Sequence, residues 1–212
     1  LHQKAGIGEG PLSRRVKERY ARDDQFSQFE GAEMIAEKHG LSKDALDEFA
    51  LSSHRRAAAA IEAGAFANEI VGVQVDNGIH DTDEGVRRDA SIEGIQGVKP
   101  IQDGGRITAA NASQICDGAS AALVVNERAL KAHNLTPIAR IHQMHVSAGD
   151  PVIMLEEPIE ATGQALKKAA MRLDDIDLFE VNEAFASVPL AWLKATGADP
   201  AKLNVNGGAI AL

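Results

Sequence analysis

The chain of 212 residues contains a single cysteine, Cys116. One cysteine can form neither an internal disulfide nor a cysteine-rich zinc site, so we expect an intracellular protein. The sequence has no apolar run long enough to cross a membrane, and the residues after Leu1 do not resemble a signal peptide.

Basic residues are in the minority: 22 Lys and Arg stand against 31 Asp and Glu, for a formal net charge of −9. This balance argues against nucleic acid or an anionic membrane as the main partner, because both require a basic face. A small anion held by a few local Arg or Lys side chains remains compatible with it. The 44% hydrophobic and 25% charged residues exclude a disordered or collagen-like chain.

Hydrophobic periodicity predicts an α/β chain, because strands and helices alternate from residue 119 onward. The polar first thirty residues are expected to be loop, with a glycine-rich opening at 6–10 and one short helix in the charged stretch 14–24. Residues 76–103 are expected to be a loop. Further helices are predicted at 31–39, 42–64, 126–133, 158–171 and 183–195, and strands at 69–75, 119–125, 137–146, 177–181 and 203–205.

Most patterns that suggest chemistry have a simpler interpretation. Cys116 is followed by Asp117, which would raise a thiol pKa, so a buried structural cysteine is favoured over a nucleophile. His142 and His145 point to opposite faces of a strand, which disfavours a metal site. The histidines on or near the ends of helices are expected to be solvated or capping residues; they are His39, His54 and His133.

Two further motifs, one acidic and one rich in glycine, do not match the calcium-binding and dinucleotide-binding loops that they resemble. The acidic loop from Asp81 has Ile92 at its twelfth position, where an EF-hand requires glutamate. The glycines at 6, 8 and 10 have the wrong spacing for a dinucleotide loop and follow no strand.

Two motifs follow predicted strands near the end of the chain. Asn182-Glu183 comes directly after the strand at 177–181, where open α/β sheets bind ligands, although Asn182 could instead cap the next helix. Asn206-Gly207-Gly208 follows the strand at 203–205, and its paired glycines permit a tight turn or a close approach of backbone to ligand.

Taken together and in this order, these motifs resemble the thiolase family, whose members cleave 3-ketoacyl-coenzyme A (3-ketoacyl-CoA) with CoA or condense two acyl-CoA molecules in the reverse direction. The resemblance runs from about residue 31 to the end and covers roughly the middle of a thiolase. The segments that carry it are 31–38, 46–57, Asp83-Glu84 with Arg87, 107–113, 117–119, Asn182-Glu183-Ala184-Phe185 and 204–212.

The resemblance implies roles for particular residues. Asn182 matches the family asparagine that holds a water in an oxyanion hole, a task that suits a neutral amide. Arg87 matches the arginine beside the adenine and phosphates of CoA, where a planar cation can stack and pair. The matched positions of the pantetheine channel are Ala109, Ala112 and Ser113, and those around the acyl tunnel are Met154 and Phe185.

Other family groups are expected to lie outside these residues. The nucleophilic cysteine would precede Leu1, the Gly-His-Pro histidine and the second cysteine would follow Leu212, and Cys116 matches neither cysteine. The chain begins without Met and ends in an apolar, glycine-rich stretch, so we expect a fragment or a processed piece of a longer protein. Without the nucleophilic cysteine we expect this piece to be inactive alone. An incomplete half-sheet with an unpaired edge should make it marginally stable or prone to aggregate. Departures from the family pattern put the chain-length preference in doubt; they are Ala110, Gln114-Ile115-Cys116 and Glu156-Glu157-Pro158.

The resemblance also implies an architecture. We expect a partial, layered α/β thiolase fold, with residues 1–115 forming the loop domain and the end of the N-terminal half, and 116–212 opening the C-terminal half. The parent would be a homodimer or homotetramer of the cytoplasm or an organelle matrix, with CoA as substrate and neither metal nor organic cofactor. The alternative is a non-catalytic CoA- or acyl-binding module of the same fold.

Overall fold

The computed structural model describes residues 12–21 and 26–212. Two long helices with side-chain caps lie in the first third of the chain. The serine before each helix supplies its hydroxyl to a backbone N–H of the first turn, which satisfies one of the free donors there: Ser27 caps α3 (Gln28–Lys38), and Ser42 caps α4 (Lys43–Glu62). Both helices were predicted, and glycines with positive φ follow them at Gly40 and Gly64.

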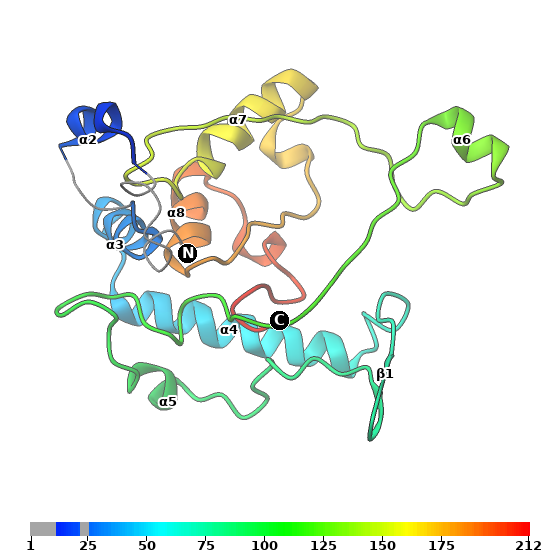
Figure 1. Ribbon diagram of the computed structural model, residues 1–212, viewed down its shortest axis with the longest axis horizontal. Helices are drawn as coiled ribbons and strands as arrows, with labels where there is room; N and C mark the ends of the chain where they lie inside the picture. The colour runs from blue at the N-terminus through cyan, green and yellow to red at the C-terminus, as the bar shows by residue number, and fades with distance from the viewer. Residues whose placement is uncertain (1–11, 22–25) are drawn as a thin grey trace.

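The core lies where α3 and α4 meet α8 (Ser187–Thr196), and α7 (Pro158–Ala169) packs on the far side of α8 (Figure 1). The tryptophan of α8, Trp192, is 1% exposed and packs against Phe179, with 5.0 Å between ring centroids. Its indole N–H donates to the Thr162 hydroxyl of α7 at 2.9 Å. Trp192 therefore joins the two helices through both apolar and polar contacts.

Several short elements complete the chain. The predicted helices at 14–24 and 126–133 are confirmed as α2 (Arg14–Tyr20) and α6 (Glu127–Ala132), whereas the glycine-rich opening at 6–10 lies outside the described residues. Three helical elements were not predicted from the sequence: α5 (Ile92–Gln96) and the 3-10 turns η1 (Leu173–Asp175) and η2 (Pro200–Lys202).

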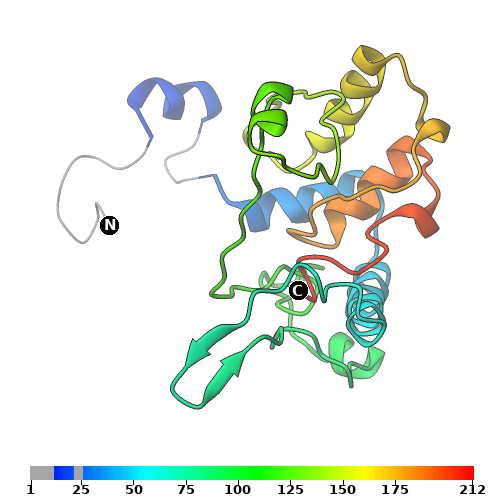
Figure 2. The same ribbon diagram turned by 90° about the vertical axis from the view of Figure 1, so that its right-hand side faces the viewer.

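The strand predicted at 69–75 is shorter in the structure and belongs to a hairpin. β1 (Val73–Val75) pairs antiparallel with β2 (Gly78–His80), and this exposed hairpin projects from the body (Figure 2). Asp76 and Asn77 form the two-residue connection, and Gly78 has a φ of +135°. A loop prediction over 76–103 was therefore wrong for β2 and for α5.

The buried strand predicted at 119–125 and the strand predicted at 137–146 are wrong for the described structure. Both segments lack regular structure and flank α6 in long connections (Figure 1). Leu123 is 77% exposed and Val146 is 94% exposed. A strand forms only where another strand satisfies its backbone hydrogen bonds, and the described residues place no partner strand beside either segment.

The strands predicted at 177–181 and 203–205 meet as a single parallel bridge. Phe179 donates its N–H to the Lys202 carbonyl and accepts from the Asn204 N–H, both at 2.9 Å. The helix α8 connects the two segments, which is the arrangement of a strand–helix–strand unit. No helix among the described residues is long and apolar enough to cross a membrane.

Apolar side chains of the 115–146 region are exposed, which makes self-association the expected behaviour of the chain on its own. Ile115 and Ile138 are fully exposed and Val146 nearly so. Replacing these three with threonine removes apolar surface without disturbing described packing. We expect sedimentation velocity to show concentration-dependent association of the wild-type chain and less of it in the triple variant. Equal association of the two proteins would contradict this explanation.

Candidate coenzyme A site

The segments that are distant in sequence and carry the motifs lie side by side. Ala112 and Phe185 form an antiparallel bridge, in which the Ser113 N–H donates to the Ala184 carbonyl at 3.0 Å and the Ala186 N–H donates to the Asn111 carbonyl at 2.8 Å. The loop at 107–113 is therefore joined by main-chain hydrogen bonds to the segment that follows Asn182.

Gln114 ties two further segments to this pair. Its backbone N–H donates to the Ala209 carbonyl at 3.1 Å. Its side-chain amide lies within 2.9 Å of both the Gly85 carbonyl and the Ile210 carbonyl. A primary amide has two N–H groups and can serve two carbonyls at once, so Gln114 links the segment before Arg87 to the C-terminal segment. Gln114 departs from the family pattern, and no role for it was predicted from the sequence.

The carboxylate of Glu183 lies at the centre of a buried network. Glu183 is 1% exposed and accepts from the Ser53 hydroxyl at 2.6 Å, the Asn204 side-chain amide at 2.9 Å and the Ile210 N–H at 3.2 Å. Ser53 belongs to α4, so one side chain fixes this helix, the Asn182-Glu183 segment and the C-terminal segment together. All three donors are neutral, and together they replace the water that a buried carboxylate loses.

The paired glycines of the C-terminal segment are required by this packing. A Cβ atom at Gly208 would lie 2.5 Å from Glu183 Cδ. Gly207 has a φ of +85°, and a Cβ there would lie 2.8 Å from both the Ala57 Cβ and the Ser53 carbonyl oxygen of α4. The tight turn is present, with the Gly207 N–H donating to the Asn204 carbonyl at 3.0 Å, and the atoms that the glycine backbone approaches belong to α4 and Glu183.

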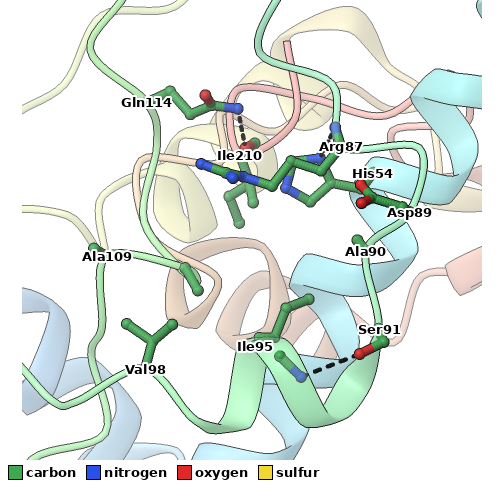
Figure 3. A pocket seen from close by; sticks show the side chains of 12 residues that line it. His54, Arg87, Asp89, Ala90, Ser91, Ile95, Val98, Ala109, Gln114 and Ile210 are labelled. Carbon is green, nitrogen blue, oxygen red and sulfur yellow. Dashed lines mark hydrogen bonds between the residues drawn. The ribbon is translucent and has the colours of Figure 1, made fainter.

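A pocket of about 380 Å³ lies between α4, α5 and the joined segments (Figure 3). Arg87 and Asp89 contribute its charged side chains, and the backbone segments around Ala109 and Gly94 leave room because their side chains are small or absent. Further residues that line the pocket are His54, Ala90, Ser91, Ile95, Val98, Ala110, Gln114 and Ile210. The combination of small residues with an exposed cation suits a ligand that has a narrow chain and an anionic end.

His54 forms the wall of the pocket on the α4 side. Its side chain is buried at 4% exposure, and its Nδ1 accepts from the Arg87 backbone N–H at 3.2 Å. Burial lowers the pKa of His54 below its ordinary value, and the nearby Arg87 charge lowers the pKa further. The expectation of a solvated or capping histidine is wrong for His54. His54 falls one turn from Ala50 and Ala57 on the buried stripe of α4, a signal that could have identified it.

The predicted CoA-binding residues are partly brought together. Arg87 and Ala109 line the pocket. Ala112 is buried beside Phe185, and Ser113 is exposed one residue further along the same loop. Asn182 is exposed and precedes Glu183 of the buried network. Since α8 begins at residue 187 with Ala186 as its N-cap, Asn182 does not cap that helix.

The two predicted acyl-tunnel residues lie in different surroundings. Phe185 is 2% exposed and packs edge-to-face on Phe29, with 5.5 Å between ring centroids. Met154 has a φ of +36° and lines a second pocket of about 540 Å³ together with Lys38 and His39. The acyl-tunnel assignment stays a prediction for both residues.

The second pocket contains a charged cluster centred on Glu156. Its carboxylate lies 2.6 Å from Lys38 Nζ and 2.7 Å from His39 Nε2. Burial raises the pKa of Glu156, but the hydrogen bonds and charges of Lys38 and His39 outweigh burial and hold the pKa below its ordinary value. The cluster joins the end of α3 to the segment before α7.

Cys116 is exposed, so the prediction of a buried cysteine is wrong for the described structure. Among the described residues, no group of three or more His, Cys, Asp or Glu side chains is arranged to hold a metal ion.

Two family models match the chain. "Thiolase, N-terminal domain" matches residues 22–128, and "Thiolase, C-terminal domain" matches residues 135–212. The division predicted after residue 115 stays a prediction.

Named relatives agree with this assignment. The chain is 55% identical over 190 residues to the steroid 3-ketoacyl-CoA thiolase FadA6 of Mycobacterium tuberculosis, covering 90% of this chain and 46% of that protein. It is 44% identical over 191 residues to a 3-ketoacyl-CoA thiolase of Aeromonas hydrophila, covering 85% and 49%. The chain thus spans about half the length of these relatives.

Solved structures share the fold. Human mitochondrial 3-ketoacyl-CoA thiolase, and the same enzyme in complex with CoA, each superpose with a TM-score of 0.79 at 43% identity. The superpositions cover 86% of this chain and 47% and 46% of the human chains. The predicted partial α/β fold is confirmed. The chain belongs to the thiolase family.

Proposed function

We propose that this chain supplies the CoA pocket and the oxyanion-hole asparagine, Asn182, of a thiolase-type acyltransferase. Such an enzyme cleaves 3-ketoacyl-CoA with CoA or runs the reverse Claisen condensation. The proposal rests on one observation: four motif segments, at 46–57, 83–87, 107–113 and 204–212, contribute residues to one pocket. Arg87 provides its cation and Ala109 its narrow wall.

The charges of the pocket favour one orientation of CoA. The Arg87 guanidinium can pair with phosphate oxygens and stack on adenine, both of which a planar cation does well. Asp89 would repel a phosphate, but its oxygens can accept from a sugar hydroxyl or the adenine amino group. The pantetheine arm would then run past Ala109 along the loop toward Ser113. This loop is hydrogen-bonded to the segment that follows Asn182, so the arm would lead toward the reacting thioester.

Asn182 would act on the reacting end. The network around Glu183 fixes the backbone next to Asn182 while leaving the Asn182 amide exposed. A neutral amide that is held in place can orient a water toward developing negative charge without changing its own charge. The chain's single thiol, Cys116, lies in an exposed connection and has no role in this scheme. We therefore expect this chain alone to bind CoA but not to transfer acyl groups.

Arg87→Ala tests the pocket against a matched neighbour. We expect the substitution to weaken CoA binding by about tenfold, because a charge-assisted contact to phosphate is lost. Arg88→Ala removes the same charge one residue away, where Arg88 pairs with Glu62 at 3.2 Å instead of lining the pocket, and should leave affinity nearly unchanged. Isothermal titration calorimetry of both variants measures the difference.

Pantetheine serves as the ligand control because it lacks the phosphates and adenine of CoA. We expect it to bind the wild-type chain and Arg87→Ala equally. Equal weakening of CoA binding by the two arginine substitutions would contradict the proposed site, since it would indicate a general effect of charge. Acyl transfer from acetoacetyl-CoA to CoA by the 212-residue chain would contradict the expected inactivity of the chain alone.

A further inference from the structure

One hydrogen bond connects the pocket's cation to the helix beneath it. His54 of α4 accepts the Arg87 backbone N–H through Nδ1 at 3.2 Å, and Figure 3 shows the imidazole beside Arg87. The Arg87 side chain is exposed, so burial of that side chain does not fix its position. The backbone contact to His54, together with the Gln114 bond to Gly85, anchors the segment that presents the guanidinium.

This hydrogen bond requires a neutral imidazole. Nδ1 can accept only when it carries no proton, which places the single ring proton on Nε2. Protonation would turn Nδ1 into a second donor that faces the Arg87 N–H and would add a positive charge beside the guanidinium. Burial and Arg87 both lower the pKa of His54, so the ring stays neutral at neutral pH.

In the part of the chain that the structure describes, few charged side chains line the pocket with His54. From the 85–91 segment, Arg87 and Asp89 line the same pocket, whereas the loop at 109–114, the C-terminal segment and α5 contribute neutral side chains to it. One turn away on α4 lie Ala50, Leu51, Ala57 and Ala58. Glu183 contacts the preceding residue, Ser53. Of the described residues that share the pocket with His54, only Asp89 would favour its protonation, and Arg87 opposes it.

We propose that neutral His54 is the positioning residue for Arg87: it holds the 85–91 segment on α4 so that the guanidinium faces the pocket, and its protonation releases that segment. The ligand in this inference is CoA and so rests on the proposed function, whereas the positioning itself does not. The consequence is an affinity for the anionic end of CoA that falls as His54 becomes protonated.

Two substitutions separate hydrogen bonding from titration. His54→Asn places an amide oxygen near the position of Nδ1 and cannot titrate, whereas His54→Leu keeps an apolar side chain but no acceptor. At pH 7.5 we expect His54→Asn to bind CoA within about twofold of wild type and His54→Leu to bind about fivefold more weakly, the effect of one lost hydrogen bond. Calorimetric titration with CoA measures all three affinities.

The pH profile distinguishes positioning from mere packing. The phosphates of CoA titrate equally for every variant, so the ratio of wild-type to His54→Asn affinity isolates the imidazole. Because the pKa of His54 is lowered, we expect this ratio to be constant above pH 6.5 and to fall in more acidic solution. A ratio that is constant down to acid pH would overturn the inference.

A measurement without ligand keeps this inference separate from the proposed function. In ¹⁵N–¹H spectra, the Arg87 amide should shift on acidification of the wild-type chain, stay constant in His54→Asn and be displaced at all pH values in His54→Leu. If CoA binds none of the proteins while the Arg87 amide shift changes as His54 is protonated or substituted, the positioning role holds and the proposed function fails. If CoA binds but the Arg87 amide shift changes neither on acidification nor on substitution of His54, the positioning role fails and the proposed function stands.

Discussion

Gly207→Ala is expected to reduce the free energy of unfolding by about 3 kcal/mol or more, whereas Gly197→Ala should reduce it by about 1 kcal/mol. Both glycines have positive φ, at +85° and +71°, so alanine meets a similar conformational cost at each. Only Gly207 lacks space: its new Cβ would lie 2.8 Å from the Ala57 Cβ of α4, while nothing lies within 4 Å of a Cβ at Gly197. The difference between the variants therefore measures close packing alone.

Urea unfolding followed by the fluorescence of Trp192 provides the comparison, because this buried side chain is the only tryptophan of the chain. Gly64→Ala supplies a second control, with a φ of +70° and no atom within 4 Å. Equal losses of stability at Gly207 and at the two open glycines would contradict the packing of the C-terminal segment on α4.

Glu183→Ala should be among the most destabilising single substitutions, with an expected loss of about 4 kcal/mol. It leaves three buried donors without their acceptor and opens a cavity at the junction of three segments. Glu183→Gln keeps the side-chain volume but turns an NH₂ group toward the three donors that Glu183 accepts from. We expect it to lose about 2 kcal/mol in the same urea experiment.

Glu180→Gln is the matched control, because it removes the same charge three residues earlier. Burial, followed by repulsion from Glu183, raises the pKa of Glu180, so folding disfavours the charged form of this side chain relative to water. A neutral glutamine there should leave stability unchanged or slightly higher. Comparable losses for Glu180→Gln and Glu183→Gln would show that net charge, and not the network, accounts for the effect.

Helices could be predicted from the sequence because their signals are local. Ser42, the apolar stripe that includes Leu46 and Ala50, and Gly64 lie within one segment and specify α4 without reference to the rest of the chain. Pro158 similarly marks the first turn of α7. The strand predictions at 119–125 and 137–146 were wrong for the opposite reason. Their apolar composition is a local property, but strand formation depends on a partner that the described residues do not provide.

The candidate site was predictable in part. The motif order identified the family and with it Arg87 and Ala109, both of which line the pocket. Residue types alone could not reveal that Glu183, rather than its neighbour Asn182, is buried, because adjacent polar residues after a strand differ only in which face they occupy. Nor could they reveal that Gln114 joins two segments, since that role depends on carbonyls nearly thirty and a hundred positions away.

Locating CoA on the chain tests the proposed CoA site most directly. Titration of the ¹⁵N-labelled protein with CoA should shift the backbone amides of Arg87, Ala90, Ala109 and Gln114 and leave those of Lys38, His39 and Met154 at the second pocket unchanged. Shifts confined to the second pocket, or no shifts from a folded chain, would contradict the claim that the joined motif segments form the CoA site.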